Sequence, residues 1–193
     1  MVVSYGNESK AFGNIDNIST MDIPVSAASV KIRNTASKNL YVSLINEIQP
    51  SADEMIPAQS DGVSVSVRYT DISGCPVDIT DLKQGEELYA DITISKKDAL
   101  RTDSMALTFK VPSGWEIWNE RLHSDGQSKV KMDIRDDRVC WYFSLDSSET
   151  KSFRIKLRAA YEGEYIHPVI MAEDMYRADC RACTASSKVK ITK

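Results

Sequence analysis

The stretch from residue 63 to residue 70, Val-Ser-Val-Ser-Val-Arg-Tyr-Thr, alternates apolar and polar residues without a break. The same period of two recurs in three later segments, 88–95, 105–111 and 153–159. Such an alternation gives a strand one apolar face and one wet face, which is typical of antiparallel sheets packed on one side. These four segments therefore predict an all-β fold.

Shorter apolar runs and frequent turns complete the pattern. Further strands are expected at Val139–Leu145, Tyr165–Met171 and Val189–Ile191. Gly-containing turn signals lie between the runs, at Ser73-Gly74, Gln84-Gly85, Pro112-Ser113-Gly114, Asp125-Gly126 and Glu162-Gly163. About seven short strands with turns at this density are typical of an antiparallel β-sandwich.

The segment before residue 59 has a different character. Val25–Ile32 and Leu40–Ile45 predict two or three extra strands, whereas residues 49–59 contain two prolines and indicate a linker. So few strands cannot bury a sheet core alone. We therefore expect a partial β segment with its linker at residues 1–58, and the sandwich at residues 59–193.

Composition excludes several classes of protein. The 24 Lys and Arg residues against 28 Asp and Glu give a net charge of −4, which argues against general binding of nucleic acid. No run approaches the roughly 18 apolar residues that a membrane span needs. The start of the chain shows no signal peptide, and Val2, Val3 and Tyr5 resemble the middle of a strand, so we expect a piece of a longer exported chain.

The sequence offers little catalytic chemistry. His123 lies in a turn, and His167 precedes Pro168 within an expected strand, so a structural or exposed role is favoured for both. Neither a Gly-x-Ser-x-Gly elbow nor a Gly-rich phosphate loop occurs. We therefore expect neither enzyme activity nor a cofactor.

The cysteines leave the redox compartment open. Cys180 and Cys183 form one Cys-x-x-Cys pair, but a structural zinc site would need a second pair or two histidines. The favoured interpretation of this pair is a surface loop that carries two thiols or a local disulfide.

Charged residues gather at two further places. Arg135 and Arg138 interleave with the carboxylates at 133, 136 and 137, which favours a charge-paired turn at a hairpin corner over a calcium loop, so no metal is expected. Basic residues at 154, 156 and 158 form a stripe on the outer face of one strand. Most such stripes are solvated faces, and a partner contact stays open here.

Several motifs from Pro112 onward follow one another in a distinctive order. They are PSGWEIWNERL at 112–122, MDIRDDRV at 132–139, WYFSL at 141–145, FRIKLRAAYEG at 153–163 and AEDMY at 172–176. Their order and spacing resemble the C-terminal end of bacterial alpha-2-macroglobulins, in the last macroglobulin-like domain. The likeness runs from about Gly62 to Lys193, and the residues before it resemble the second half of a CUB domain.

The resemblance implies a macroglobulin or fibronectin III-like sandwich and a place in a large protease trap. In such traps a protease cuts a bait region and is caged, and many members add a Cys–Gln thioester bond. The thioester motif Cys-x-Glu-Gln is absent from this chain. We therefore expect a non-catalytic domain whose partners are upstream domains of the same polypeptide and, through the full-length molecule, proteases. The expected location is the periplasm or cell envelope, with a lipoprotein anchor on the parent.

The resemblance also selects candidate residues. Met175 and Tyr176 are the candidates for docking on the thioester domain, although they could equally close the end of the sandwich. Structural roles are expected for Trp115, Asn119, Arg121, Asp133, Arg135, Asp136, Asp137 and Arg138. An alternative function is a stand-alone adhesion or binding module that uses its basic strand face.

Overall fold

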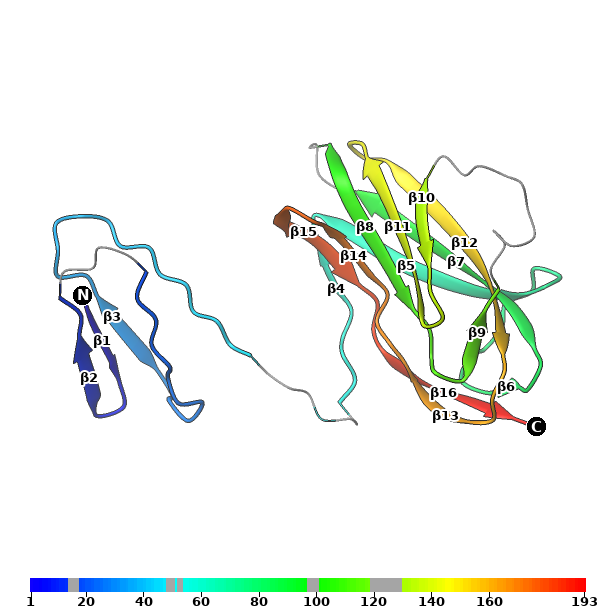
Figure 1. Ribbon diagram of the computed structural model, residues 1–193, viewed down its shortest axis with the longest axis horizontal. Coiled ribbons are helices and arrows are strands. Elements are labelled where there is room, and N and C mark those ends of the chain that lie inside the picture. Colours follow the sequence, from blue (N-terminus) through cyan, green and yellow to red (C-terminus); the bar gives the residue numbers. More distant parts are fainter. Residues whose placement is uncertain (14–17, 48–50, 52–53, 97–100, 119–129) are drawn as a thin grey trace. The chain divides into compact units, whose positions relative to one another are not determined.

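The computed structural model describes the chain except for residues 14–17, 48–50, 52–53, 97–100 and 119–129 (Figure 1). Every regular element of the described residues is a β-strand, so the all-β prediction is confirmed. The chain divides into two compact units, Met1–Pro50 and Ser51–Lys193.

The unit Met1–Pro50 contains one small antiparallel sheet. Its strands are β1 (Val2–Tyr5), β2 (Glu8–Ala11) and β3 (Val30–Arg33), in the order β2-β1-β3. Val3 is the one buried apolar side chain among the described residues of this unit. The prediction of a strand at Leu40–Ile45 is wrong, since the structure assigns no strand there and Tyr41 is 91% exposed. Three short strands offer no apolar face large enough to cover such a run.

The unit Ser51–Lys193 is built from three sheets. The six-stranded sheet has the order β10-β11-β8-β14-β15-β4, with β4 (Gln59–Asp61), β8 (Thr102–Lys110), β10 (Lys131–Ile134), β11 (Arg138–Leu145), β14 (Met171–Asp174) and β15 (Arg177–Cys183). The four-stranded sheet has the order β5-β7-β12-β9, with β5 (Val63–Asp71), β7 (Glu87–Lys96), β9 (Trp115–Ile117) and β12 (Thr150–Ala159). The three-stranded sheet has the order β13-β16-β6, with β6 (Leu82–Lys83), β13 (Gly163–His167) and β16 (Ser187–Thr192).

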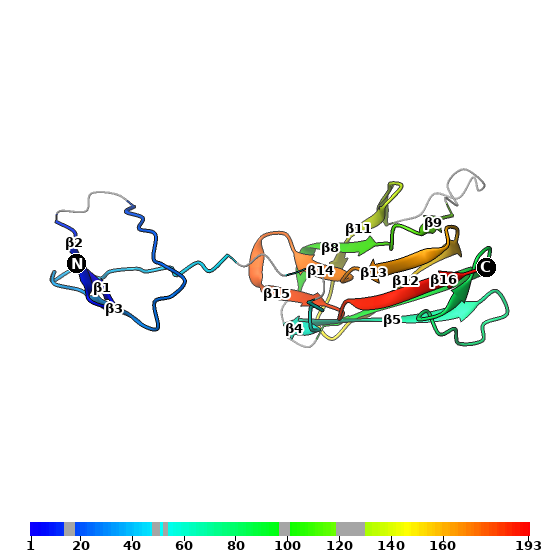
Figure 2. The same ribbon diagram turned by 90° about the horizontal axis from the view of Figure 1, so that it is seen from below.

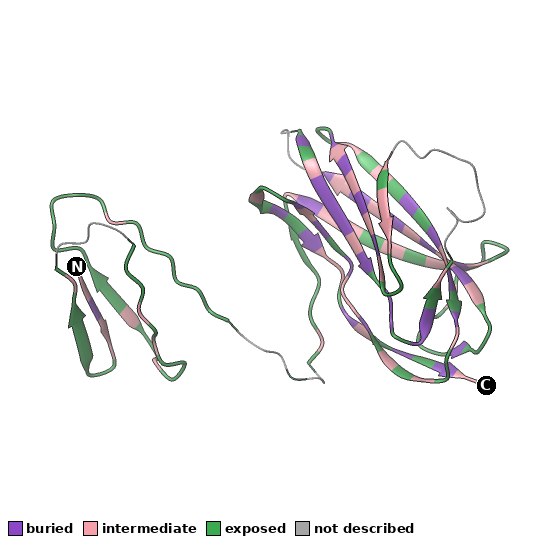
Figure 3. Cartoon of the chain, in the orientation of Figure 1, coloured by how far each residue is buried: buried purple, intermediate pink, exposed green. Residues whose placement is uncertain are grey.

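The alternation seen in the sequence sends one face of each long strand into a shared core (Figure 3). Ile92 on β7, Phe109 on β8 and Leu157 on β12 are fully buried in it. Burying a side chain of this size stabilises the fold by about 1.5–3 kcal/mol. The core therefore holds the four-stranded and six-stranded sheets face to face as a sandwich.

One predicted strand is divided in the structure. The run Tyr165–Met171 was expected to be continuous, but β13 ends at His167 and β14 begins at Met171. Pro168 lies at the break, and it has no N–H to donate to a ladder. The chain uses the break to leave the three-stranded sheet and enter the six-stranded one.

Tyr165 forms a corner that ties β13 to the turn before β9. Its hydroxyl donates to the carbonyl oxygens of Tyr161 and Glu162, at 3.1 and 3.0 Å. Its ring lies so close to Gly114 that a Cβ added there would overlap the ring carbons. A Tyr hydroxyl bonded to the backbone a few residues upstream is a known device for locking a sandwich corner.

We expect Gly114→Ala to destabilise the sandwich by about 1–3 kcal/mol, because the added methyl group must displace the packed Tyr165 ring. Urea unfolding followed by tryptophan fluorescence measures this loss. Gly13→Ala is the matched control, since a Cβ at Gly13 meets nothing within 4 Å. Equal stability of Gly114→Ala and the unsubstituted chain would contradict the tight packing.

Candidate docking site

Met175 and Tyr176 form the two-residue tip of the hairpin between β14 and β15. Both side chains are exposed, Met175 by 50% and Tyr176 by 84%. Figures 1 and 2 show this hairpin at the end of the sandwich away from the C-terminus. The tip therefore exposes an apolar side chain and a phenol to solvent, and the two paired strands β14 and β15 support it.

The tip is held against the start of β8. β14 pairs with β8, in a register that places Asp174 opposite Met105. The Met175 amide donates to the carbonyl oxygen of Ser104 at 3.0 Å, and the Tyr176 amide donates to the Asp174 carboxylate at 2.9 Å. Both amides of the tip are thus hydrogen-bonded.

The predicted charge-paired turn is present between β10 and β11. The Arg135 amide donates to the Arg138 carbonyl oxygen at 2.9 Å and closes the turn. Arg135 pairs with Asp133 at 3.0 Å, and Arg138 donates to Asp137 at 3.0 Å, while Asp136 is exposed. The hydrogen bond from Arg138 holds the pKa of the Asp137 carboxyl below its usual value. Exposed pairs of this kind add only about 0–1 kcal/mol each.

The tryptophan motif divides between core and surface. Trp115 on β9 is 3% exposed, and its ring meets Tyr69 edge-on at 5.9 Å between centroids. Trp118 is 44% exposed beneath the ammonium of Lys156, 4.9 Å from the ring centroid. Asn119 and Arg121 lie outside the described residues, so their expected structural roles stay predictions.

The Cys-x-x-Cys pair does not form a surface loop, and that prediction is wrong. Cys180 and Cys183 both belong to β15, where Cys180 is fully buried and Cys183 is partly exposed. Residues three apart on a strand point to opposite faces, so the two thiols cannot meet. The strand escaped detection because its polar and small residues, Arg-Ala-Asp-Cys-Arg-Ala-Cys, alternate only weakly.

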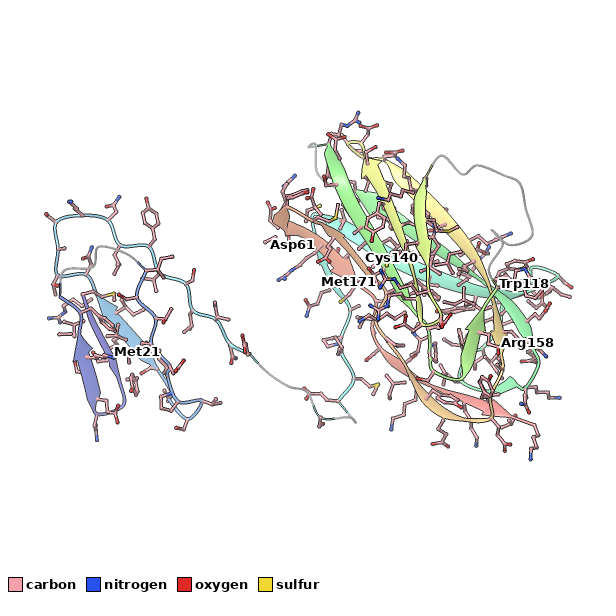
Figure 4. All side chains as sticks on the ribbon, in the orientation of Figure 1. Met21, Asp61, Trp118, Cys140, Arg158 and Met171 are labelled. Atoms are coloured by element: carbon pink, nitrogen blue, oxygen red, sulfur yellow. The ribbon has the colours of Figure 1, made fainter. Side chains whose placement is uncertain are left out.

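The basic stripe on β12 is largely neutralised by the neighbouring strand β7. Arg154 donates two hydrogen bonds to Asp91, at 2.6 and 3.0 Å, and Lys156 pairs with Glu87 at 2.7 Å. The hydrogen bond from Arg154 holds the pKa of Asp91 below its usual value. Arg158 also lies opposite Glu87 in the register and is labelled in Figure 4. The paired charges give this face little attraction for an acidic partner.

A family model described as the bacterial alpha-2-macroglobulin MG10 domain matches residues 62–179. The match covers more than half of the chain and includes the Met175–Tyr176 tip. The chain belongs to the bacterial alpha-2-macroglobulin family.

Two curated relatives agree with this assignment. The alpha-2-macroglobulin of Pasteurella multocida (strain Pm70) is 29% identical over 141 residues, which cover 70% of this chain and 7% of the relative. The alpha-2-macroglobulin homolog of Yersinia pestis is 25% identical over 191 residues, which cover 83% of this chain and 9% of the relative. The macroglobulin chain thus spans less than a tenth of the length of either relative.

Solved structures show the same fold. The crystal structure of Salmonella alpha-2-macroglobulin reacted with methylamine aligns with a TM-score of 0.65 at 19% identity, over 73% of this chain and 10% of that one. Native Escherichia coli alpha-2-macroglobulin, spanning domain MG7 to the C-terminus, aligns with a TM-score of 0.62 at 18% identity, over 70% of this chain and 24% of that one. The macroglobulin sandwich predicted from the sequence is therefore confirmed.

His167 of the macroglobulin domain occupies a structural position. It is 3% exposed, and the Pro168 carbonyl oxygen, 2.8 Å from Nδ1, can only accept a hydrogen bond, so Nδ1 carries the proton. Nε2 is then the acceptor for the Tyr69 hydroxyl at 2.6 Å. Burial lowers the pKa of His167 and raises that of Tyr69, so both side chains are neutral at pH 7.

No metal site or membrane-spanning helix is found in the part of the macroglobulin chain that the structure describes. Among the described residues, His, Cys, Asp and Glu form no group of three that could hold an ion. No helix of the described residues is long and apolar enough to cross a bilayer. A hollow of about 550 Å³ lies over the outer face of β13 and β16, between Glu164, Lys188 and Lys190.

The buried His167 predicts a stability that falls in mild acid. The unfolded chain binds a proton near pH 6.5, whereas the folded chain resists it, so stability is present above that pH and is lost below it. We expect the free energy of unfolding to be lower at pH 5.5 than at pH 7.5, because the unfolded chain gains a proton that the buried ring disfavours. Urea unfolding at both pH values measures it.

The matched variants for this prediction are His167→Gln and His123→Gln. His167→Gln removes the titrating ring and is expected to flatten the pH dependence, while His123→Gln is expected to retain it. An unchanged slope in His167→Gln would show that other groups govern the acid sensitivity.

Proposed function

We propose that this chain supplies a non-catalytic structural domain of a bacterial alpha-2-macroglobulin-type protease inhibitor. In this proposal the Met175–Tyr176 tip docks on the thioester domain of the same polypeptide and shields the thioester from water. The observation that carries it is the exposed Met-Tyr pair at a backbone-anchored hairpin tip within the MG10 match.

The chemistry of the tip suits an apolar pocket with a polar rim. Met adapts its unbranched side chain to irregular surfaces, and Tyr combines a large apolar ring with a hydroxyl that can reach a partner. Arg177, the next residue, pairs with Asp179 at 3.2 Å, so the positive charge beside the tip is already compensated. Such a tip can enter a pocket without burying an unpaired charge.

Within the described residues, the contacts of His167 support a structural role for this side chain. His167 has both ring nitrogens engaged, one by Pro168 and one by Tyr69. The described cysteines carry no thioester motif, since none is followed by Glu-Gln at the required spacing. Trapping of proteases is therefore proposed for the full-length molecule, with this domain as a scaffold and clamp.

The remaining parts of the proposal concern the rest of the polypeptide. The sheet of Met1–Pro50 has almost no buried apolar side chain among its described residues, which supports half of a CUB-like domain completed by chain elsewhere. We further propose a parent in the periplasm or cell envelope, anchored as a lipoprotein. A coding frame that continues upstream to a lipoprotein signal supports this location, and a frame that lacks one removes it.

Replacing the tip tests the docking directly. In the full-length polypeptide, Met175→Ala combined with Tyr176→Ala is expected to speed release of the thioester thiol about tenfold or more, since a lost docking contact of about 1.4 kcal/mol corresponds to a factor of ten. Titration of free thiol over time measures the release.

Met171→Ala combined with Tyr161→Ala is the matched control for the tip. It removes another exposed Met and another exposed Tyr, 37% and 58% exposed, from other parts of the same domain. Met171 lies on β14, as Figure 4 shows. A thioester lifetime that is unchanged by the tip variant would end the docking proposal.

A further inference from the structure

The residue that ends β14 is a buried carboxylate next to the docking tip. Asp174 is 8% exposed, although Asp residues are seldom buried unless they are paired or hydrogen-bonded. Burial raises the pKa of Asp174, and hydrogen bonds from Thr102 and from the Tyr176 amide outweigh that effect, so the net pKa lies below its usual value. The group is therefore charged at neutral pH, and its hydrogen bonds are charge-assisted.

The two oxygens of this carboxylate join two elements that are distant in the sequence. Oδ1 accepts a hydrogen bond from the Tyr176 amide at 2.9 Å. An Asp side chain that bonds the backbone N–H two residues later in this way forms an Asx-turn. Oδ2 accepts the hydroxyl of Thr102, the first residue of β8, which is itself only 3% exposed. One side chain thus fixes the backbone of the tip to the start of the neighbouring strand.

The β14–β15 ladder does not supply hydrogen-bond partners for the amides of the tip. The register of β14 and β15 shifts after Glu173, from a pair with Arg181 to the pair of Asp174 with Arg177. An irregularity of this kind breaks the ladder locally and re-aims side chains. Beyond it, the tip amides find partners outside the β14–β15 ladder, at Ser104 and at the Asp174 carboxylate.

We propose that Asp174 and Thr102 are positioning residues that set the conformation of the Met175–Tyr176 tip before it docks. This inference rests on the proposed docking function. The hydroxyl of Thr102 orients the carboxylate, and the carboxylate holds the Tyr176 amide, so the phenol leaves the hairpin in one direction. A tip that is already ordered loses less conformational entropy when it enters a pocket.

The matched pair Thr102→Val and Thr102→Ser separates this role from general stability. Val keeps the branched shape and removes the hydroxyl, while Ser keeps the hydroxyl. In the 193-residue chain, Thr102→Val is expected to speed hydrogen exchange of the Tyr176 amide about tenfold, with core amides such as Ile92 and Phe109 unchanged. Thr102→Ser is expected to exchange at nearly the original rate.

Two results would overturn the positioning role in that experiment. One is an unchanged exchange rate at Tyr176 in Thr102→Val. The other is an equal rise at Tyr176 and in the core, which would indicate a loss of global stability only. An exchange rate at Tyr176 that stays near the original in Thr102→Ser would show that the hydroxyl is responsible. A loss of side-chain packing alone would instead affect Thr102→Ser, which lacks the methyl group.

The full-length polypeptide separates failure of this inference from failure of the docking proposal. If alanine at both tip positions speeds thiol release and Thr102→Val does so about threefold or more, positioning by Thr102 is supported. If the tip variant acts and Thr102→Val does not, the positioning role is overturned while docking stands. If the tip variant itself has no effect, docking fails and the role of Thr102 in docking fails with it.

Discussion

The ring of His167 is the point at which the three sheets of the sandwich meet. It lies edge-on to Tyr69 on β5, to Trp115 on β9 and to Phe109 on β8, with centroids 5.8, 5.6 and 6.1 Å apart. Because its two nitrogens are engaged by the Tyr69 hydroxyl and the Pro168 carbonyl, the ring is held neutral in one tautomer. Leaving a buried imidazole nitrogen without a partner would cost free energy, so these two hydrogen bonds help to fix the orientation of the ring within the cluster.

The position of His167 sets where the chain leaves the three-stranded sheet. Pro168 ends the ladder of the three-stranded sheet, and the chain then enters the six-stranded sheet as β14, beside β8. At its far end β14 reaches Asp174 next to Thr102, where the hairpin turns and displays its tip. The exposed Met-Tyr pair is therefore placed by the same strands that form the core, and such rigid support suits the docking that we propose for it.

Local patterns in the sequence were sufficient to predict the sandwich but not its details. β5, β7, β8 and β12 alternate apolar and polar residues, so their burial could be foreseen from the pleat alone. β15 could not be predicted in this way, because its small and polar residues carry a weak pattern and it is recognisable only once it pairs with β14. The tip was found through its resemblance to a family motif, whereas the bond between Asp174 and Thr102 joins residues 72 positions apart and depends on strand pairing.

The central claim is that the tip is buried against another domain of the parent. Oxidation of Met175 by dilute peroxide tests this claim most directly. Exposed methionine forms its sulfoxide readily, and mass spectrometry of peptides that contain Met171 and Met175 reports it. We expect rapid oxidation of Met175 in the 193-residue chain, strong protection in the native full-length polypeptide, and renewed oxidation after a protease has triggered the rearrangement, with Met171 as the internal reference. Equal oxidation rates of Met175 in all three states would contradict the claim.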